Sequence, residues 1–381
     1  MTAGGPCNAP DVVDVVALGE SMVAFLPSRP GRLADVPSFA RAIGGAESNV
    51  VCTLAAAGHA VRWVSRVGAD GFGDHLVETV GAYGVDTASV RRDPARPTGV
   101  YFRTAGDRGT DAHEVAYYRA GSAASAMSTG TVDLDAVRAG RILHLSGITA
   151  ALSEDCLGLL RDLTAPRPGR PPVSFDVNHR AGLWPDPARA GRVLLDLARA
   201  CDLVFVGTDE AEAAWGVTGG PRAVRAALPE PSVLVVKEGA RGATAFVRTP
   251  GEPLRPPAPA RGAAPGDAAP PDGTHRPTPP DSVTFVPALD VDVVAPVGAG
   301  DAFAAGFLSG TLRGLPVRER LRHGHLMAAA ALTAPGDLAA PPARAHADRL
   351  AALDDAAWGR LRLGPGWTDA VEGAEEEVRT P

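Results

Sequence analysis

The sequence lacks the features of several large protein classes. No stretch approaches the roughly 18 uninterrupted apolar residues of a membrane-spanning helix, and the N-terminal segment has no basic region followed by an apolar one, so we predict no secretory signal. The four cysteines are far apart and lack the CxxC spacing of zinc and redox sites, so we expect free thiols in a reducing compartment. These absences predict a cytoplasmic protein without a membrane partner.

Positive charge is also scarce. The chain has 37 lysine and arginine residues against 44 aspartate and glutamate residues, for a net charge of −7. Nucleic-acid binding requires a basic face, so we predict no nucleic-acid partner. Lys237 is the only lysine of the chain. Because arginine supplies nearly all the positive charge, a single arginine is a weak functional signal in this sequence.

What is present indicates a globular α/β fold. The 381 residues are 45% hydrophobic and 21% charged, enough for one large core with or without a small appended unit. Strands alternating with helices predict a sandwich in which a mostly parallel sheet is covered on both faces, with ligands at the carboxyl ends of the strands. The predicted strands are 12–18, 60–67, 142–145, 173–176, 203–206, 233–236 and 289–294, and the predicted helices are 46–58, 74–83, 154–163, 187–200, 210–215 and one from residue 301.

Other segments break this alternation. Residues 23–40 and 98–119 have strand patterns joined by polar turns without intervening helices, which predicts a small separate sheet. Residues 249–282 are rich in Pro, Ala and Gly and have almost no large apolar side chains, which predicts a disordered surface insertion. The acidic tail 368–381 is predicted to be disordered too. The main unit is expected to span residues 12–345.

The motif that carries chemistry is Gly298-Ala299-Gly300-Asp301, which precedes an alanine-rich helical stretch. Its glycines let backbone amides converge at the positive end of a helix, where they bind an anion. A carboxylate beside such a site would be repelled by the anion, so we interpret Asp301 as a general base toward a hydroxyl that attacks phosphorus. The alternative is that the motif only caps a helix and Asp301 compensates the helix dipole.

Competing phosphate-binding motifs are absent. A dinucleotide-binding fingerprint would need a third glycine at Phe303 and a place in the first strand–helix unit. The sequence contains no GxxxxGK[ST] motif and no HRD and DFG pair, which excludes P-loop and protein kinases.

The motif in its context resembles a known family. GAGDAFAAGF at 298–307 resembles the C-terminal signature of the ribokinase-like (pfkB) carbohydrate kinases, and the glycine-rich segments 44–49 and 66–73 resemble their N-terminal motifs. The similarity runs from about residue 15 to about residue 337. Segments 117–123, 143–149 and 176–184 further resemble the 2-keto-3-deoxygluconate kinase branch. The resemblance implies a ribokinase-like three-layer sandwich with a small β-lid, and ATP and Mg²⁺ as cofactors. Because the exposed face of a small lid sheet is suited to a subunit contact, we also expect a homo-oligomer formed through the lid.

The resemblance also implies roles for individual residues. Asp301 would be the catalytic base, and the amides of Gly298, Ala299 and Gly300 would form the anion hole. The residues implied in substrate binding are Gly45, Asn49, Tyr101, Tyr117, Arg119, Arg180, Asp301 and Asp337. Those implied in ATP binding are Asn178, Lys237, Gly239, Ala240, Gly242, Gly298 and Gly300, and Glu210 would act indirectly on the metal.

Several of these residues have simpler alternatives. A guanidinium group matches the carboxylate of a sugar acid bidentately, and Arg180 follows a strand end, but it could also be an ordinary surface arginine. Tyr117 could only pack within the lid, and Asn49 could satisfy local backbone at a helix start. Glu47 is expected to compensate the helix dipole rather than to touch substrate.

The sequence departs from the family pattern at two positions. Ala295 replaces the aspartate that some members link to a monovalent-cation site, so we do not predict potassium activation. Gly207 replaces the asparagine of an NxxE motif whose glutamate is Glu210. The predicted reaction is ATP-dependent phosphorylation of the 6-hydroxyl of 2-keto-3-deoxygluconate. A fructokinase- or ribokinase-type enzyme, or a degenerate kinase that binds sugar as a regulator, stays open as an alternative.

Overall fold

An eight-stranded sheet forms the centre of the computed structural model, which describes residues 11–29, 31–104, 114–248 and 281–369. The strand order is β14-β13-β12-β11-β10-β9-β1-β4. All neighbours from β12 to β4 pair in parallel, whereas β13 and β14 form an antiparallel edge, so the prediction of a mostly parallel sheet is confirmed. The strands are β1 (Val13–Leu18), β4 (Val61–Val64), β9 (Gly140–Ser146), β10 (Val173–Asp176), β11 (Leu203–Gly207), β12 (Val233–Lys237), β13 (Gly242–Val247) and β14 (Ser282–Pro287).

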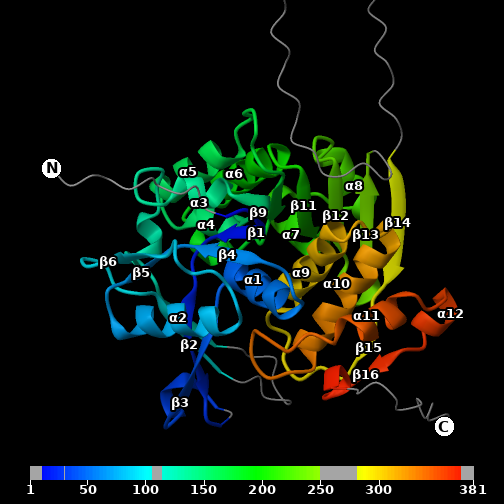
Figure 1. Ribbon diagram of the computed structural model, residues 1–381, viewed down its shortest axis with the longest axis horizontal. Helices are drawn as coiled ribbons and strands as arrows, with labels where there is room; N and C mark the ends of the chain where they lie inside the picture. The colour runs from blue at the N-terminus through cyan, green and yellow to red at the C-terminus, as the bar shows by residue number, and fades with distance from the viewer. Residues whose placement is uncertain (1–10, 30, 105–113, 249–280, 370–381) are drawn as a thin grey trace, which may run out of the picture.

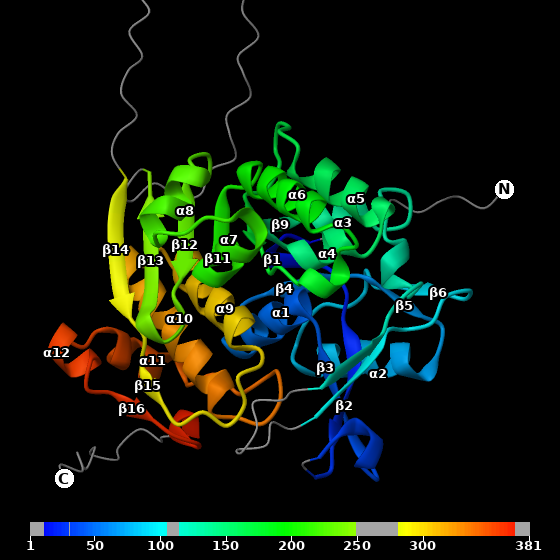
Figure 2. The ribbon, with the colours of Figure 1, turned by 180° about the vertical axis from the view of Figure 1, so that it is seen from behind.

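Helices cover both faces of this sheet, as Figures 1 and 2 show. Alternate side chains of a strand point to opposite faces, so Val15 and Ala17 belong to one core while Val16 and Leu18 belong to the other. The first core is closed by α1 (Ala46–Ala56), α9 (Ala299–Leu312), α10 (Val317–Leu332) and α11 (Arg344–Ala351). The second is closed by α3 (Leu134–Arg138), α4 (Gly147–Ala151), α5 (Glu154–Thr164), α6 (Pro187–Arg199), α7 (Thr208–Trp215) and α8 (Pro221–Ala227). The three-layer α/β sandwich is confirmed.

A second, four-stranded sheet projects from the body near α2 (Gly71–Ala82), as Figures 1 and 2 show. It consists, in spatial order, of β3 (Phe39–Gly44), β2 (Met22–Pro27), β7 (Val100–Arg103) and β8 (Val115–Tyr118). This is the predicted small sheet, called the lid sheet below. Its first segment runs on to Gly44 because β2 pairs Met22 with Gly44. Residues 30 and 105–113 of the predicted lid segments lie outside the described residues.

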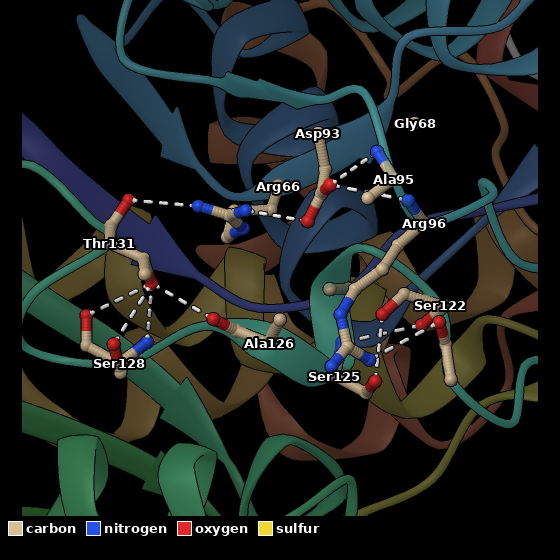
Figure 3. A network of polar contacts seen from close by, with 12 residues as sticks. Arg66, Gly68, Asp93, Ala95, Arg96, Ser122, Ser125, Ala126, Ser128 and Thr131 are labelled. Carbon is tan, nitrogen blue, oxygen red and sulfur yellow. Dashed lines mark hydrogen bonds and ion pairs between the residues drawn. The ribbon is translucent and has the colours of Figure 1, made fainter.

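The glycine-rich segment 66–73 lies at the base of the lid sheet. Its first part, β5 (Arg66–Gly68), pairs with β6 (Arg91–Asp93), and Figure 3 shows Arg66 between Asp93, at 2.6 Å, and the carbonyl oxygen of Thr131, at 3.5 Å. Asp70 caps α2 and also accepts hydrogen bonds from the amide and the hydroxyl of Thr98, two residues before β7. This segment therefore anchors the chain where it enters the lid sheet.

The prediction that residues 289–294 form a strand of the main sheet was wrong. Only β15 (Asp290–Val291) forms there, and it pairs with β16 (Arg362–Leu363) in a separate two-stranded sheet. The amides of Val294 and Ala295 instead donate to the carbonyl oxygen of Leu332, at the end of α10. The predicted strand 60–67 divides into β4 and β5. Three helices begin earlier than predicted: α2 at Gly71 rather than 74, α7 at Thr208 rather than 210, and α9 at Ala299 rather than 301.

The described chain differs from the predicted bounds near the insertion and the C-terminus. Residues 249–280 of the predicted insertion lie outside the described residues, while Asp281 pairs with Arg225 at 2.7 Å and Ser282 begins β14. Beyond residue 345 the packed chain continues through α12 (Asp355–Trp358), β16 and a short 3₁₀ turn, η5 (Trp367–Asp369), and Trp358 is fully buried. Residues 370–381 of the predicted tail lie outside the described residues.

No disulfide or membrane-spanning helix appears in the described ranges. Cys52, Cys156 and Cys201 are free and buried, and Cys7 is not among the described residues. In the described part of the chain, no helix has both the length and the apolar character to cross a membrane.

Candidate active site

The carboxyl ends of the parallel strands meet the beginning of α9 at one place. Asp176 is the last residue of β10 and Lys237 is the last residue of β12. The ammonium group of Lys237 donates to both carboxylate oxygens of Asp176, at 2.9 and 3.2 Å. A β-carbon built on Gly300 of α9 would lie 3.7 Å from Lys237 Nζ, so this ammonium group also lies beside the GAGD motif.

Asp301 lies next to this ion pair and is held by Asn49 of α1, whose Nδ2 donates to Asp301 Oδ2 at 2.8 Å. Desolvation raises the pKa of Asp301 to about 8, with a further contribution from Asp176, although the Asn49 hydrogen bond, Lys237 and Arg180 oppose the shift. Asp301 therefore binds a proton more tightly in the free protein than an exposed aspartate does. Asn49 Oδ1 is buried and has no hydrogen-bond partner among the described residues, so it is available to a ligand hydroxyl.

The GAGD backbone has the form of an anion site. Gly298 is the N-cap residue of α9 and has a positive φ of 78°. A β-carbon at Gly298 would lie 2.1 Å from the carbonyl oxygen of Asp337, so only glycine fits. Within the described structure no side chain caps this helix end, which leaves the first-turn amides at 299–301 for an anion.

Asp337 connects this site to the lid sheet. Its Oδ1 lies 3.1 Å from Arg103 Nη2, and its Oδ2 accepts a hydrogen bond of 3.0 Å from the hydroxyl of Tyr101. Desolvation raises the pKa of Asp337, whereas Arg103 and Tyr101 oppose the shift. Gly45, the N-cap residue of α1, follows β3 and accepts the amide of Asn49 at 2.8 Å. The predicted residues Gly45, Asn49, Tyr101, Asp301 and Asp337 therefore occur in one region between the lid sheet and the main sheet.

The two predicted arginines differ in their surroundings. Arg119 forms an ion pair with the buried Glu20, which also accepts the hydroxyl of Ser122. The side chain of Arg180 is 54% exposed, donates to the carbonyl oxygen of His179, and lies 3.9 Å from Glu210. The charge of Arg119 is thus already compensated, while the guanidinium group of Arg180 can still receive a ligand anion.

Tyr117 lies opposite Tyr101 in the lid sheet, so its side chain is on the face that carries Tyr101. It is 52% exposed, and its ring centroid lies 5.6 Å from that of Tyr101. The guanidinium carbon of Arg119 lies 5.8 Å from the centre of the Tyr117 ring. Contact with Tyr101 and Arg119 agrees with packing inside the lid sheet and leaves part of the ring open to a ligand.

A pocket of about 700 Å³ adjoins the anion site. Of the residues predicted to bind ATP or to form the anion hole, the pocket is lined by Lys237, Gly239, Ala240, Gly242, Ala299 and Gly300. Asn178 and Gly298 are not part of its lining. Its other walls are largely apolar and are built from Val291, Val293, Phe303, His325, Ala329 and Leu332, among others. An apolar pocket that ends at an anion site suits a nucleotide, whose base is flat and apolar and whose phosphates are charged.

Asn178, two residues after β10, is the only non-glycine residue with positive φ in the described chain, at 40°. Its amide donates to Asp176 Oδ1 at 3.2 Å, and its buried side-chain oxygen lacks a partner among the residues described. A strained backbone at the end of a central strand is typical of functional sites.

Glu210, the residue predicted to act indirectly on the metal, accepts hydrogen bonds from two backbone amides. Its Oε2 accepts the amide of Gly207 at 2.7 Å, and its Oε1 accepts the amide of His179 at 3.2 Å. Burial raises the pKa of Glu210, and Lys237 opposes the shift. The described residues contain no group of three or more His, Cys, Asp or Glu side chains arranged for a metal. This donor set fits Mg²⁺ that is held mainly by substrate phosphates and water, with Glu210 and Asp176 nearby, rather than a protein-only metal site.

Two charged residues of the site are not among those predicted from the sequence. Arg103 is two residues after Tyr101 on β7, and residues at this spacing share one face of a strand, so its place beside the site could have been suspected, although its partner Asp337 could not. Asp176 ends a predicted strand, where ligand-binding side chains are expected.

Comparisons with known proteins show which proteins the chain as a whole is similar to. The pfkB family carbohydrate kinase profile matches residues 13–263 and 277–344. The chain is 33% identical to the 2-dehydro-3-deoxygluconokinase of Bacillus subtilis (strain 168), over 87% of this chain and 93% of that protein. It is 31% identical to the enzyme of the same name from Thermoproteus tenax, over 91% of this chain and 98% of that protein. The crystal structure of a PfkB protein from Polaromonas sp. JS666 superimposes with a TM-score of 0.71 at 31% identity, covering 88% of this chain and 99% of that one.

The raised pKa of Asp301 predicts a pH-dependent effect on stability. The native state holds this proton up to a pKa of about 8, whereas an unfolded aspartate releases it near pH 4, so Asp301 destabilises the fold progressively as the pH rises between these values. Asp301→Asn should therefore unfold at higher urea concentration than the wild type at pH 9, with a smaller difference at pH 5. Asp196→Asn, at an exposed position on α6, is the control. A difference that does not change with pH would contradict the shifted pKa.

Proposed function

The chain belongs to the pfkB family of carbohydrate kinases and is thus a phosphotransferase with an alcohol group as acceptor, and we propose that it transfers the γ-phosphoryl group of ATP to the 6-hydroxyl of 2-keto-3-deoxygluconate. The observation that carries the proposal is the position of Asp301. It lies at the uncapped end of α9, beside the pocket proposed for ATP, and its hydrogen bond to Asn49 directs it toward the region below the lid sheet.

In the proposed reaction, Asp301 accepts the proton of the acceptor hydroxyl while the hydroxyl oxygen bonds to the γ-phosphorus and the bond from phosphorus to the bridging oxygen of ADP breaks. The first-turn amides of α9 donate hydrogen bonds to the transferring phosphoryl oxygens. Asn49 orients Asp301, and its free side-chain oxygen accepts a sugar hydroxyl. Mg²⁺ bound together with ATP would neutralise part of the negative charge of the phosphates.

The sugar-acid acceptor is supported by the charges that surround the site. Arg103 and Arg119 each lie close to a carboxylate of the protein, at ion-pair distance. Arg180 is 3.9 Å from Glu210 and 54% exposed, so its guanidinium group can also pair with a substrate carboxylate. The similarity to two 2-dehydro-3-deoxygluconokinases, another name for 2-keto-3-deoxygluconate kinases, points to the same acceptor. The compensated charge of Arg119 is the observation that favours a neutral sugar instead. A degenerate, sugar-binding regulator is disfavoured because Glu210 still binds the amide at Gly207 and Asp301 is intact.

The first kinetic test is Asp301→Asn. The variant should bind ATP but lose about 10²- to 10⁴-fold in kcat, since it cannot accept the proton. Calorimetric ATP titration and a coupled assay of ADP release measure the two properties. A kcat above about a tenth of the wild-type value would contradict the base assignment.

The second test concerns the acceptor. Arg180→Ala should lower kcat/KM for 2-keto-3-deoxygluconate about 30-fold or more and change the value for neutral sugars little, and Arg180→Lys should recover little because an ammonium group lacks the planar fork. Arg192→Ala, at an exposed position on α6, is the charge-matched control. An equal loss for acidic and neutral acceptors would refute the carboxylate contact. Wild-type preference for fructose or ribose would refute the sugar-acid assignment itself.

We further propose a homo-oligomer formed through the lid sheet. Its edge strand β8 exposes Val115, Tyr117 and Tyr118, with Tyr118 66% exposed. Tyr118→Asp should shift the protein toward monomer in sedimentation velocity, while Val283→Asp, at an exposed apolar position on the remote edge strand β14, should not. A wild-type protein that sediments as a monomer at micromolar concentration would exclude this assembly.

A further inference from the structure

The only lysine of the chain lies at the centre of the proposed phosphoryl-transfer site. The chain has 37 lysine and arginine residues, and all of them except Lys237 are arginine. The sequence therefore uses a guanidinium group wherever a positive charge alone is required. Lysine differs from arginine in having a compact ammonium group with three N–H donors that acts as a point charge. A position that keeps lysine in this background indicates chemistry for which arginine is unsuitable.

The surroundings of Lys237 show where that ammonium group can act. Two of its N–H donors go to the two oxygens of Asp176, which leaves one donor for a ligand. The residue lines the 700 Å³ pocket, and its Nζ would be 3.7 Å from a β-carbon at Gly300. The neighbouring strand carries Gly207 in register with Lys237, so no side chain from that position crowds the ammonium group. A guanidinium group is longer and planar, so it would present its charge and its donors differently from an ammonium group between Asp176 and the start of α9.

The charges around Lys237 are otherwise negative. Desolvation alone would lower the pKa of Lys237, but Asp176, Glu210 and Asp301 outweigh it, so the pKa is raised and the side chain stays charged. Arg180, the other cation that influences Asp301, is half-exposed. A polyphosphate chain bound here would approach the carboxyl groups of Asp176, Glu210 and Asp301, and Lys237 is the desolvated cation that lies among them.

We propose that Lys237 is a catalytic residue whose ammonium group donates a hydrogen bond to the phosphoryl group during its transfer, with Asp176 holding the ammonium group beside the α9 amides. This inference rests on the proposed kinase function. As the oxygen–phosphorus bond to the acceptor forms and the bond to ADP breaks, the hydroxyl proton passes to Asp301 and Lys237 keeps all its protons. Its charge compensates the negative charge on the phosphoryl oxygens, which a neutral side chain cannot do.

The variants Lys237→Met and Lys237→Arg test this role. Lys237→Met should lower kcat about 10²- to 10³-fold, the usual loss for a donor to a developing charge, with a much smaller change in ATP affinity measured by calorimetry. Lys237→Arg should also stay at least 10-fold below wild type, since the fork cannot replace the point charge. Arg241→Met is the matched control, because it removes a positive charge that is 82% exposed in the same loop. Because Lys237→Met leaves the buried Asp176 unpaired, its melting temperature should fall. ADP affinity equal to that of the wild type, measured at a temperature below the unfolding transition of each variant, shows that the variants are folded.

A second readout uses the uniqueness of the residue. Protein labelled with ¹⁵N-lysine has a single side-chain ammonium signal in its NMR spectrum. This signal should shift when ADP and aluminium fluoride, which mimics the transferring phosphoryl group, are added. It should shift less when ADP is added alone. A kcat within threefold of wild type in Lys237→Met, or an ammonium signal that does not respond to aluminium fluoride, would overturn the catalytic role. Failure of the wild type to phosphorylate any sugar would instead overturn the proposed function.

Discussion

The ion pair between Lys237 and Asp176 is the interaction around which the site is arranged. Carboxyl groups from β10, α7 and α9 approach one another at the carboxyl edge of the sheet, and a single ammonium group from β12 lies among them. Removing one partner of a buried ion pair commonly costs about 3–5 kcal/mol because the other charge is left uncompensated. One ammonium group cannot neutralise three carboxylates. Desolvation, together with the charge of Asp176, raises the pKa of Asp301 to about 8, which favours its neutral form over that of an ordinary aspartate.

The sugar side and the phosphate side of the site meet at Asp337. Its side chain contacts Tyr101 and Arg103 of the lid sheet, and its carbonyl oxygen lies where a side chain at Gly298 would be. A change in the position of the lid strand β7 would therefore act on the residue that packs against the anion hole. The hydrogen bond between Tyr101 and Asp337 joins the lid strand β7 to the segment after α10, although the two residues are more than 200 positions apart in the sequence.

The sequence predicted what depends on local pattern. Buried strands of a parallel sheet are continuous apolar runs, and β10 was predicted residue for residue at 173–176. The segment 289–294 has a similar apolar character, but its pairing depends on β16 and the end of α10, which no local pattern reveals. For the site, GAGD and Asp301 were recognised because their chemistry lies in one short motif. The pairings of Arg103 with Asp337 and of Arg119 with Glu20 were not, since partners of abundant arginines are set by the tertiary fold. The binding roles assigned to individual residues stay predictions.

The raised pKa of Asp301 has a consequence for selectivity between a sugar hydroxyl and water. If Asp301 is the base, only its ionised form can activate a water molecule, and burial and Asp176 disfavour that form, which opposes hydrolysis of ATP. A sugar hydroxyl that displaces water next to Asn49 also brings the acceptor into hydrogen-bond reach of the carboxyl group. The ionised form of Asp301 is favoured by Lys237 and Arg180 and opposed by desolvation and Asp176. The balance among these groups, rather than the carboxyl group alone, decides when the base is available.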